Sequence, residues 1–268
     1  MAVAKALTIA GSDSGGGAGV QADLKTFSAR GVYGASVLTA VTAQNTRAVT
    51  AVAEVAPAVV AAQLDAVLAD IAIDAIKVGM LFSAAIVDEV AERLRGILAP
   101  VVLDPVMVAK SGDALLEPEA TGALVARLVP GARLVTPNLP EAARLLGGRE
   151  AATVAEMAAQ GAALRALGAQ AVLVKGGHGT GAACTDVLVT GTGDPVLIEA
   201  PRHPTQNTHG TGCSYSSAIT AELAKGLDLI AAVRVAHAWL QGAIAAADRL
   251  EVGGGRGPVH HFHAVWPA

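Results

Sequence analysis

Residues 209–217 read HGTGCSYSS, a glycine-containing turn that opens a predicted helix. Gly210 and Gly212 let the backbone turn tightly and approach a ligand closely. The first N–H groups of a helix have no partner within it, so with Thr211 they form a site suited to an anion such as a transferring phosphoryl group. Cys213 would lie in the first turn, where the helix dipole favours a thiolate. The pattern is equally typical of an ordinary glycine turn with a small buried cysteine.

Two acidic residues and one lysine follow predicted strands and have the chemistry of a metal and phosphate site. Asp104 stands in LDPV and Glu141 in NLPE. Mg²⁺ typically takes one or two carboxylates from a protein and keeps several waters. Asn138 and Glu141 also have the spacing of a helix capping box, which would give Glu141 a structural role only. Lys175, just before two glycines, is a candidate phosphate contact, although a lone lysine at a strand end is more often a solvated surface charge.

Residues 11–23, GSDSGGGAGVQAD, form a second glycine-rich segment between a predicted strand and a predicted helix. The segment matches neither the Walker A pattern nor G-x-G-x-x-G, so a flexible turn is one interpretation. Asp23 would lie early in the helix, where a carboxylate complements the dipole or holds a substrate hydroxyl. Gln44, in TAQNT, has an amide suited to the edge of a pyrimidine or pyridine ring, or is a turn residue. Residues 177–182 match G-x-G-x-x-A but run into a strand, which excludes a dinucleotide-binding turn.

The elements that must position these residues alternate between short apolar runs and longer helical runs. Strands are predicted at 6–11, 36–41, 49–55, 74–80, 100–106, 132–138 and 171–177, with a hairpin formed by 186–191 and 195–200. The main helices are predicted at 20–31, 57–71, 118–129, 211–225 and 229–249, the last of them capped by Asp228. Two further helices are predicted to begin at caps formed by Ser83 and Thr153. This alternation predicts one α/β domain over residues 1–268, with a mostly parallel sheet and helices on both faces. The polar motifs follow the strand ends, where open sheets of this type bind ligands.

Composition narrows the function classes. The net charge of −4, with mixed signs, lacks the basic footprint of a nucleic-acid-binding protein. No window approaches the apolar length needed to cross a membrane. Two cysteines in 268 residues argue against a disulfide framework and favour a reducing compartment, so we expect a cytoplasmic protein. The HHFH segment at 260–263 is expected to pack as a tail and not to bind a metal.

Taken together, the motifs resemble one family in order along essentially the whole chain. The matching stretches are GSDSGGGAGVQADLKTFSARGVYG, TAVTAQNT, IKVGML, VVLDPVMVAKSGDALL, TPNLPEA, VLVKGGH, NTHGTGCS and GPVHHFH. They are similar to the hydroxymethylpyrimidine/phosphomethylpyrimidine kinases of thiamine biosynthesis, which have the ribokinase-like fold. The resemblance implies ATP-dependent phosphorylation of 4-amino-5-hydroxymethyl-2-methylpyrimidine and then of its monophosphate, in an enzyme that is often dimeric.

The resemblance also implies roles for individual residues. Gln44 would bind the ring nitrogen and amino group, with Asp23 near the hydroxymethyl end and Lys175 on the ATP phosphates. The ring pocket would be lined by Gly11, Ala18, Met80 and Val106. Asp104 and Glu141 would organise Mg²⁺, and Gly210, Thr211 and Gly212 would form the anion hole. Cys213 stands where ribokinase-like sugar kinases generally carry a catalytic Asp, so it is expected either to be a base with a lowered pKa or to position the hydroxyl.

Two departures from the family pattern stand out. Many relatives read DPSGGAG where this chain has DSGGGAG at residues 13–19, and the loss of Pro together with the gain of a Gly is expected to loosen positions 14–16. His237 replaces a lysine that relatives can carry. Other hypotheses are a pyridoxal kinase of the same superfamily, a thiol transferase with Cys213 as nucleophile, and a non-catalytic nucleotide-binding regulator.

Overall fold

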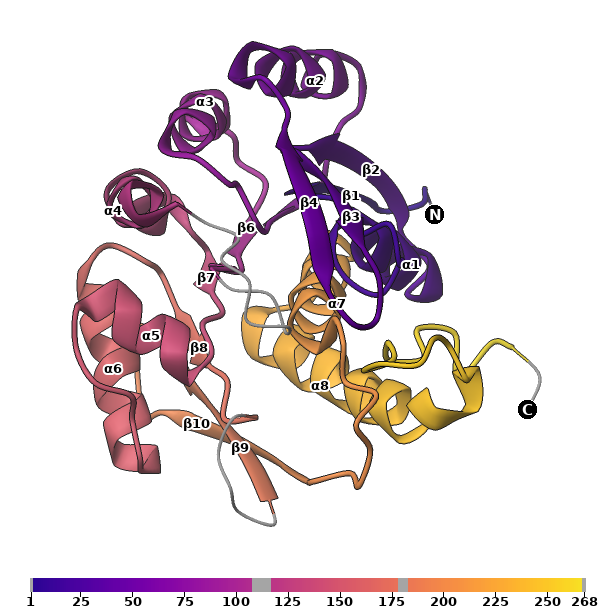
Figure 1. Cartoon of the computed structure of the whole chain (residues 1–268). Helices are drawn as coiled ribbons and strands as arrows, with labels where there is room; N and C mark the ends of the chain where they lie inside the picture. Colours follow the sequence, from indigo (N-terminus) through magenta and orange to yellow (C-terminus); the bar gives the residue numbers. More distant parts are fainter. Residues whose placement is uncertain (1, 108–116, 178–182, 267–268) are drawn as a thin grey trace.

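The computed structural model describes residues 2–107, 117–177 and 183–266 of the chain. Within these residues the main sheet has eight strands in the order β10-β9-β8-β7-β6-β5-β1-β2 (Figure 1). The parallel strands are β1 (Lys5–Ala10), β2 (Tyr33–Leu38), β5 (Ala75–Val78), β6 (Val101–Leu103), β7 (Leu134–Val135) and β8 (Val172–Val174). At one edge, β9 (Ala183–Val189) and β10 (Val196–Pro201) form the predicted antiparallel hairpin. The predicted mostly parallel α/β sheet is confirmed.

Helices cover both faces of the sheet. On one face lie α2 (Pro57–Asp70), α3 (Ala84–Leu94), α4 (Pro118–Arg127), α5 (Leu139–Leu146) and α6 (Val154–Ala166); on the other lie α1 (Gly19–Ala29), α7 (Thr211–Ala224) and α8 (Leu229–Ala245). Short 3₁₀ turns occupy Val129–Gly131 and Ala247–Leu250. Central strands are apolar on both sides because successive side chains point to opposite faces. In β8, for example, Val172 and Val174 join one core cluster and Leu173 joins the other.

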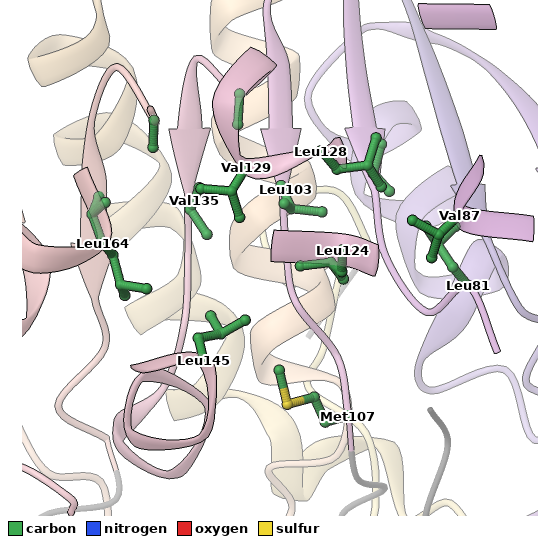
Figure 2. Close-up of a cluster of buried hydrophobic side chains, with 14 of the residues drawn as sticks. Leu81, Val87, Leu103, Met107, Leu124, Leu128, Val129, Val135, Leu145 and Leu164 are labelled. Atoms are coloured by element: carbon green, nitrogen blue, oxygen red, sulfur yellow. The ribbon is translucent and has the colours of Figure 1, made fainter. Parts of the chain in front are cut away.

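The larger core cluster lies under helices α2 to α6. Figure 2 shows part of it, where Leu103 and Val135 from adjacent strands meet Leu124 and Val129. Leu7, Ile9, Leu103 and Val135 in this cluster are fully buried. Such close packing fixes the strand ends, and therefore the loops that carry the polar motifs, with little freedom to shift.

A separate hairpin of β3 (Ala40–Gln44) and β4 (Val49–Glu54) corrects one prediction. Residues 36–41 do not form one strand, because the chain leaves the main sheet at Thr39. The Thr39 hydroxyl donates to the Met80 carbonyl at 2.7 Å, which anchors this bend over the end of β5. The hairpin then carries Gln44 to the first glycine-rich segment, where the Gln44 N–H donates to the Ser14 hydroxyl.

Local capping signals were predicted correctly. Ser83 and Asp228 accept hydrogen bonds from the first turns of α3 and α8. Thr153 and Glu156 form a reciprocal capping box at α6. In the described residues no helix is both long and apolar enough to cross a membrane.

Candidate active site

The start of α7 has the glycine turn and the free backbone N–H groups that the sequence predicted. Gly210 is the N-cap residue and has a left-handed backbone, with φ of 74°. A Cβ at this position would lie 1.7 Å from the Gly17 carbonyl oxygen, so only glycine lets the two loops touch. The Thr211 N–H donates to the Thr208 carbonyl at 3.3 Å. Those of Gly212 and Cys213 find no acceptor among the described residues and are available to a ligand.

Lys175 and Asp104 meet directly beside this helix start. The Lys175 ammonium donates to Asp104 Oδ1 at 2.8 Å, and a Cβ on Gly212 would lie 3.3 Å from the same ammonium nitrogen. Asp104 also accepts from Thr136 and Ser216, at 3.0 and 3.2 Å. Burial would lower the pKa of Lys175, but the negative charges of Asp104 and Glu141 raise it overall. Lys175 is therefore a held cation at the anion site and not a solvated surface charge.

Glu141 has the capping role that the sequence predicted and also lies near the Lys175–Asp104 pair. It forms the capping box of α5, with reciprocal bonds to Asn138 of 2.8 Å each. Its carboxylate is also close enough to Lys175 and Asp104 to interact with the charges of both. Burial, together with the charge of Asp104 and against the opposing effect of Lys175, raises the pKa of Glu141 to about 7. Two carboxylates beside one ammonium repel each other, and a further cation nearby would reduce this repulsion.

A buried ion pair that the sequence did not reveal lies behind Cys213. Lys77 on β5 and Asp23 on α1 are both fully buried, with Nζ 2.9 Å from Oδ2. Asp23 also accepts from Thr8 and Ser217, at 2.6 and 2.7 Å. Burial would lower the pKa of Lys77, but the charge of Asp23 helps to raise it overall. The only sequence signal for this pair was a lysine inside an apolar strand.

Asp23 is therefore placed differently from the ligand-contacting position that the resemblance implied. All three of its hydrogen-bond partners are protein groups, and the side chain has no exposed surface. In this structure it holds Lys77, and Lys77 in turn lies close enough to Cys213 to affect the thiol electrostatically.

The thiol of Cys213 does not have the lowered pKa expected of a base. Burial raises its pKa to about 11; Lys77 and the Gly19 N–H act against this rise, while the charges of Asp23 and Asp104 add to it. Taken as a whole residue, Cys213 is half-buried at the start of α7. At neutral pH the group is a thiol, which supports the positioning role and opposes the role of a pre-ionised base or nucleophile.

The residues expected to line the ring pocket also lie together. The Gly11 N–H donates to the Met80 carbonyl at 3.2 Å, and a Cβ on Gly11 would lie 2.5 Å from the end of the Met80 side chain. Met80 and Val106 belong to one small apolar cluster. Ala18 lies against Gly210, since a Cβ added to Gly210 would be 3.3 Å from the Ala18 Cα. The pocket residues and the anion site thus adjoin.

Gln44 reaches this region through a second pair that the sequence did not reveal. His209 Nε2 lies 2.8 Å from Asp13 Oδ2 and 3.5 Å from Gln44 Nε2. Ser14, where loosening was expected, accepts from the Gln44 N–H at 2.7 Å and donates to its carbonyl at 2.8 Å. A cavity of about 380 Å³ opens beside Gln44 and His209. A larger cavity, about 660 Å³, lies at the opposite strand ends, beyond Val101, and none of the predicted site residues lines it.

Several other predictions concern histidines and segments outside the site. Within the described part of the chain, no cluster of three or more acidic, His or Cys side chains could hold a metal by itself. His261 instead packs inside, with Nε2 2.9 Å from Ser214 Oγ, which agrees with tail packing of 260–263. His237 is buried on α8 and contacts Tyr215 and Gln241. Residues 108–116 and 178–182 lie outside the described residues.

Comparisons with known proteins identify the family and support the fold. The family model for phosphomethylpyrimidine kinase matches residues 13–260. Proteins of Rhizobium meliloti and Salmonella typhimurium named hydroxymethylpyrimidine/phosphomethylpyrimidine kinase are 58% and 56% identical, over 97% of this chain and 98% of their own length. The ADP complex of Bacillus subtilis pyridoxal kinase has a TM-score of 0.91 at 38% identity, covering 99% of this chain and 100% of that one. Phosphomethylpyrimidine kinase from Clostridium difficile has a TM-score of 0.79 at 42% identity, covering 90% and 99%. The chain therefore belongs to the phosphomethylpyrimidine kinase family and has its ribokinase-like α/β fold.

Proposed function

We propose that this chain transfers the γ-phosphoryl group of ATP to the hydroxymethyl group of 4-amino-5-hydroxymethyl-2-methylpyrimidine, and then phosphorylates the monophosphate to the pyrophosphate, in thiamine biosynthesis. The observation that carries the proposal is the start of α7. Its free N–H groups lie beside the Lys175–Asp104 pair, and the preceding Gly210 contacts the first glycine-rich loop at Gly17 and Ala18. A phosphoryl group held there would be flanked by a nucleotide site and an alcohol site.

Phosphate binding falls to the backbone and one lysine. Gly210, Thr211 and Gly212 form the turn, and the N–H groups of Gly212 and Cys213 that it leaves free would stabilise charge on the phosphoryl oxygens without reorganising. Lys175, already held by Asp104, supplies a fixed positive charge at the same place. Because phosphoryl transfer passes through a loose transition state, positioning and charge stabilisation supply most of its catalysis.

Asp104 and Glu141 fit a magnesium ion by their chemistry. They are hard oxygen donors on neighbouring elements, and burial with the charge of Asp104 raises the pKa of Glu141 in spite of Lys175, so a further cation nearby would favour the ionised carboxylate. When bound, Mg²⁺ would neutralise charge on the nucleotide phosphates, directly or through water.

Cys213 positions the acceptor hydroxyl in this proposal. The substrate oxygen forms a bond to the γ-phosphorus while the bond to ADP breaks, and the hydroxyl proton leaves late, to a phosphoryl oxygen or to solvent. A thiol with a pKa of about 11 is a poor base at pH 7, but it can fix the direction of the attacking oxygen. Lys77, held by Asp23, keeps positive charge behind the reacting groups.

Gln44 binds the ring edge in this proposal, with Gly11, Ala18, Met80 and Val106 enclosing the ring. Gln44→Ala should weaken pyrimidine binding by about 1–3 kcal/mol, because the partner groups on the ring lose their hydrogen bonds. Isothermal titration calorimetry of the binary complex measures this loss. An unchanged Kd would remove Gln44 from ring recognition.

The direct test measures ADP release separately with the hydroxymethylpyrimidine and with its monophosphate. The proposal predicts turnover with both, and no ADP release above the background hydrolysis of ATP without them. A covalent adduct on Cys213 in mass spectra, formed without ATP, would instead support a thiol transferase. Ligand binding without ADP release would support a regulator.

Pyridoxal is a second candidate substrate, because solved pyridoxal kinases match nearly the whole chain. The complex of the Staphylococcus aureus enzyme with AMP-PCP and pyridoxal has a TM-score of 0.90 at 34% identity. Steady-state kinetics with both substrates decides between them. A kcat/KM for pyridoxal well above the pyrimidine value would overturn the substrate assignment.

We also propose a cytoplasmic homodimer. The two cysteines, Cys184 and Cys213, are free thiols, as expected in a reducing compartment. Light scattering coupled to size-exclusion chromatography tests the dimer, which should show twice the 26.6 kDa chain mass.

A further inference from the structure

His209 joins the first glycine-rich loop to the residue assigned to ring recognition. Its Nε2 lies 2.8 Å from Asp13 Oδ2 and 3.5 Å from Gln44 Nε2. The ring packs tightly, since a Cβ on Gly17 would lie 2.4 Å from His209 Cδ2. A rotation of the imidazole away from Asp13 would therefore meet the facing loop. One nitrogen atom thus serves both neighbours.

The proton on His209 Nε2 is fixed by Asp13. The carboxylate accepts the N–H groups of Gly15 at 2.8 Å, Gly17 at 3.1 Å and Ala18 at 2.8 Å. Burial would raise the pKa of Asp13, but the hydrogen bond and charge of His209, with backbone N–H groups, lower it overall. An ionised carboxylate only accepts hydrogen bonds. The imidazole nitrogen facing it must therefore carry hydrogen, whether the ring is neutral or cationic.

This proton conflicts with an amide nitrogen at the same place. If Gln44 Nε2 faces His209 Nε2, an N–H opposes an N–H across 3.5 Å. Exchanging the amide oxygen and nitrogen leaves the shape of the side chain unchanged. The oxygen then shares the His209 N–H as a second acceptor.

Thr42 independently favours the same exchange. Its hydroxyl donates to the Ser12 carbonyl at 2.8 Å, which uses its one hydrogen. The other end of the Gln44 amide lies 3.4 Å from that hydroxyl oxygen. A hydroxyl whose hydrogen is committed can accept from an NH₂ group but cannot donate to a second oxygen. Both neighbours of Gln44 thus require oxygen toward His209 and nitrogen toward Thr42.

We propose that the Asp13–His209 pair is a positioning device that sets the orientation of the Gln44 amide and thereby selects aminopyrimidine rings. This rests on the proposed function. With its orientation fixed, Gln44 presents an acceptor on the His209 side and a donor on the Thr42 side. A 4-aminopyrimidine carries the matching donor and acceptor, its amino group and ring nitrogen, on adjacent atoms. Pyridoxal lacks an adjacent amino donor and ring acceptor, so it cannot satisfy both ends of the amide.

The kinetic test compares the natural pyrimidine with an analogue that lacks the 4-amino group. In the native enzyme, removing the amino group should lower kcat/KM by roughly 10- to 100-fold, as expected for one unmet buried hydrogen bond. In His209→Leu the amide is free to turn, so this penalty should shrink to about threefold or less, mainly through a higher KM for the natural pyrimidine. His209→Gln keeps a side-chain N–H donor and should restore most of the penalty.

His203→Leu is the matched control, because His203 bonds Gln241 at 3.1 Å and, in the part of the chain that the structure describes, makes no hydrogen bond to Asp13, His209 or Gln44. It should leave the penalty unchanged. A full penalty in folded His209→Leu, or the same loss in His203→Leu, overturns the proposal. Absence of pyrimidine turnover in the native enzyme would instead overturn the proposed function itself.

Neutron diffraction from deuterated native protein tests the orientation without any variant. We expect deuterium atoms on the Gln44 amide atom that lies nearest Thr42, and one deuterium atom on His209 Nε2. Deuterium atoms on the amide atom nearest His209 would overturn the proposal, whatever the kinetics show.

Discussion

Asp186→Asn should gain stability relative to the native chain as the pH rises. Asp186 lies on β9 and is 7% exposed. It accepts a hydrogen bond at 2.9 Å from the N–H of Gly176, the residue that follows Lys175 in the chain. Burial raises its pKa from 3.8 to about 6, although the Gly176 N–H and the charge of Lys175 oppose the rise. Asparagine keeps an acceptor for Gly176 but carries no titrating proton. The substitution therefore isolates the cost of ionising this buried group.

The sign follows from proton binding. The folded chain holds the Asp186 proton more tightly than the unfolded chain does, so its stabilising contribution is complete below pH 3.8. That contribution is lost as the pH rises toward and through 6. Each pKa unit corresponds to about 1.4 kcal/mol, so the full effect is about 3 kcal/mol and about 2 kcal/mol of it falls between pH 4.5 and 7.

Urea unfolding of both chains at several pH values measures this difference. The two chains share every other titrating group, so subtracting their unfolding free energies at each pH leaves the effect of Asp186. Asp194→Asn, at an exposed position in the β9–β10 turn, reports the effect of losing one surface charge. A difference between Asp186→Asn and the native chain that varies by less than about 0.5 kcal/mol over this range would refute the reasoning.

Three further predictions concern the start of α7 and the ion pair behind it. Because burial raises the pKa of Cys213 to about 11, the rate of its alkylation by iodoacetamide should keep rising above pH 9. Peptide mass spectrometry measures this rate, and a plateau near pH 8 would contradict the prediction. Lys77→Met should lower the unfolding free energy by about 3–5 kcal/mol, because it leaves the buried Asp23 without its cation. Adding Asp23→Asn should recover part of this loss in a double-mutant cycle, whereas strictly additive losses would mean that the two residues are not coupled. Gly210→Ala should lower both the melting temperature and the kcat/KM for ATP, because its Cβ would lie 1.7 Å from the Gly17 carbonyl oxygen. In Gly212→Ala the Cβ would lie 3.3 Å from the nearest atom, so this substitution should chiefly change the KM for ATP. Equal melting temperatures of the two variants in calorimetry would count against this packing argument.

Local structure was the part most accessible from the amino-acid sequence. The caps at Ser83, Thr153 and Asp228 were predictable because a cap depends on residues three positions apart. The parallel sheet followed from apolar runs alternating with helical runs. The division at Thr39 was not predictable, because the bond to Met80 that anchors the bend joins positions 41 residues apart.

The site divides in the same way. The sequence determined that a glycine turn opens α7 and that Asp104, Glu141 and Lys175 follow strands, since strand ends of a parallel sheet meet at one edge. Only the tertiary structure decided the protonation of Cys213, because burial outweighs the opposing effects of Lys77 and the Gly19 N–H on its pKa. The same holds for Lys77 and His209, whose partners Asp23 and Asp13 lie 54 and 196 residues away in the chain. A charge or a shared proton depends on which groups surround it in space, and that arrangement exists only after the sheet and its helices have packed.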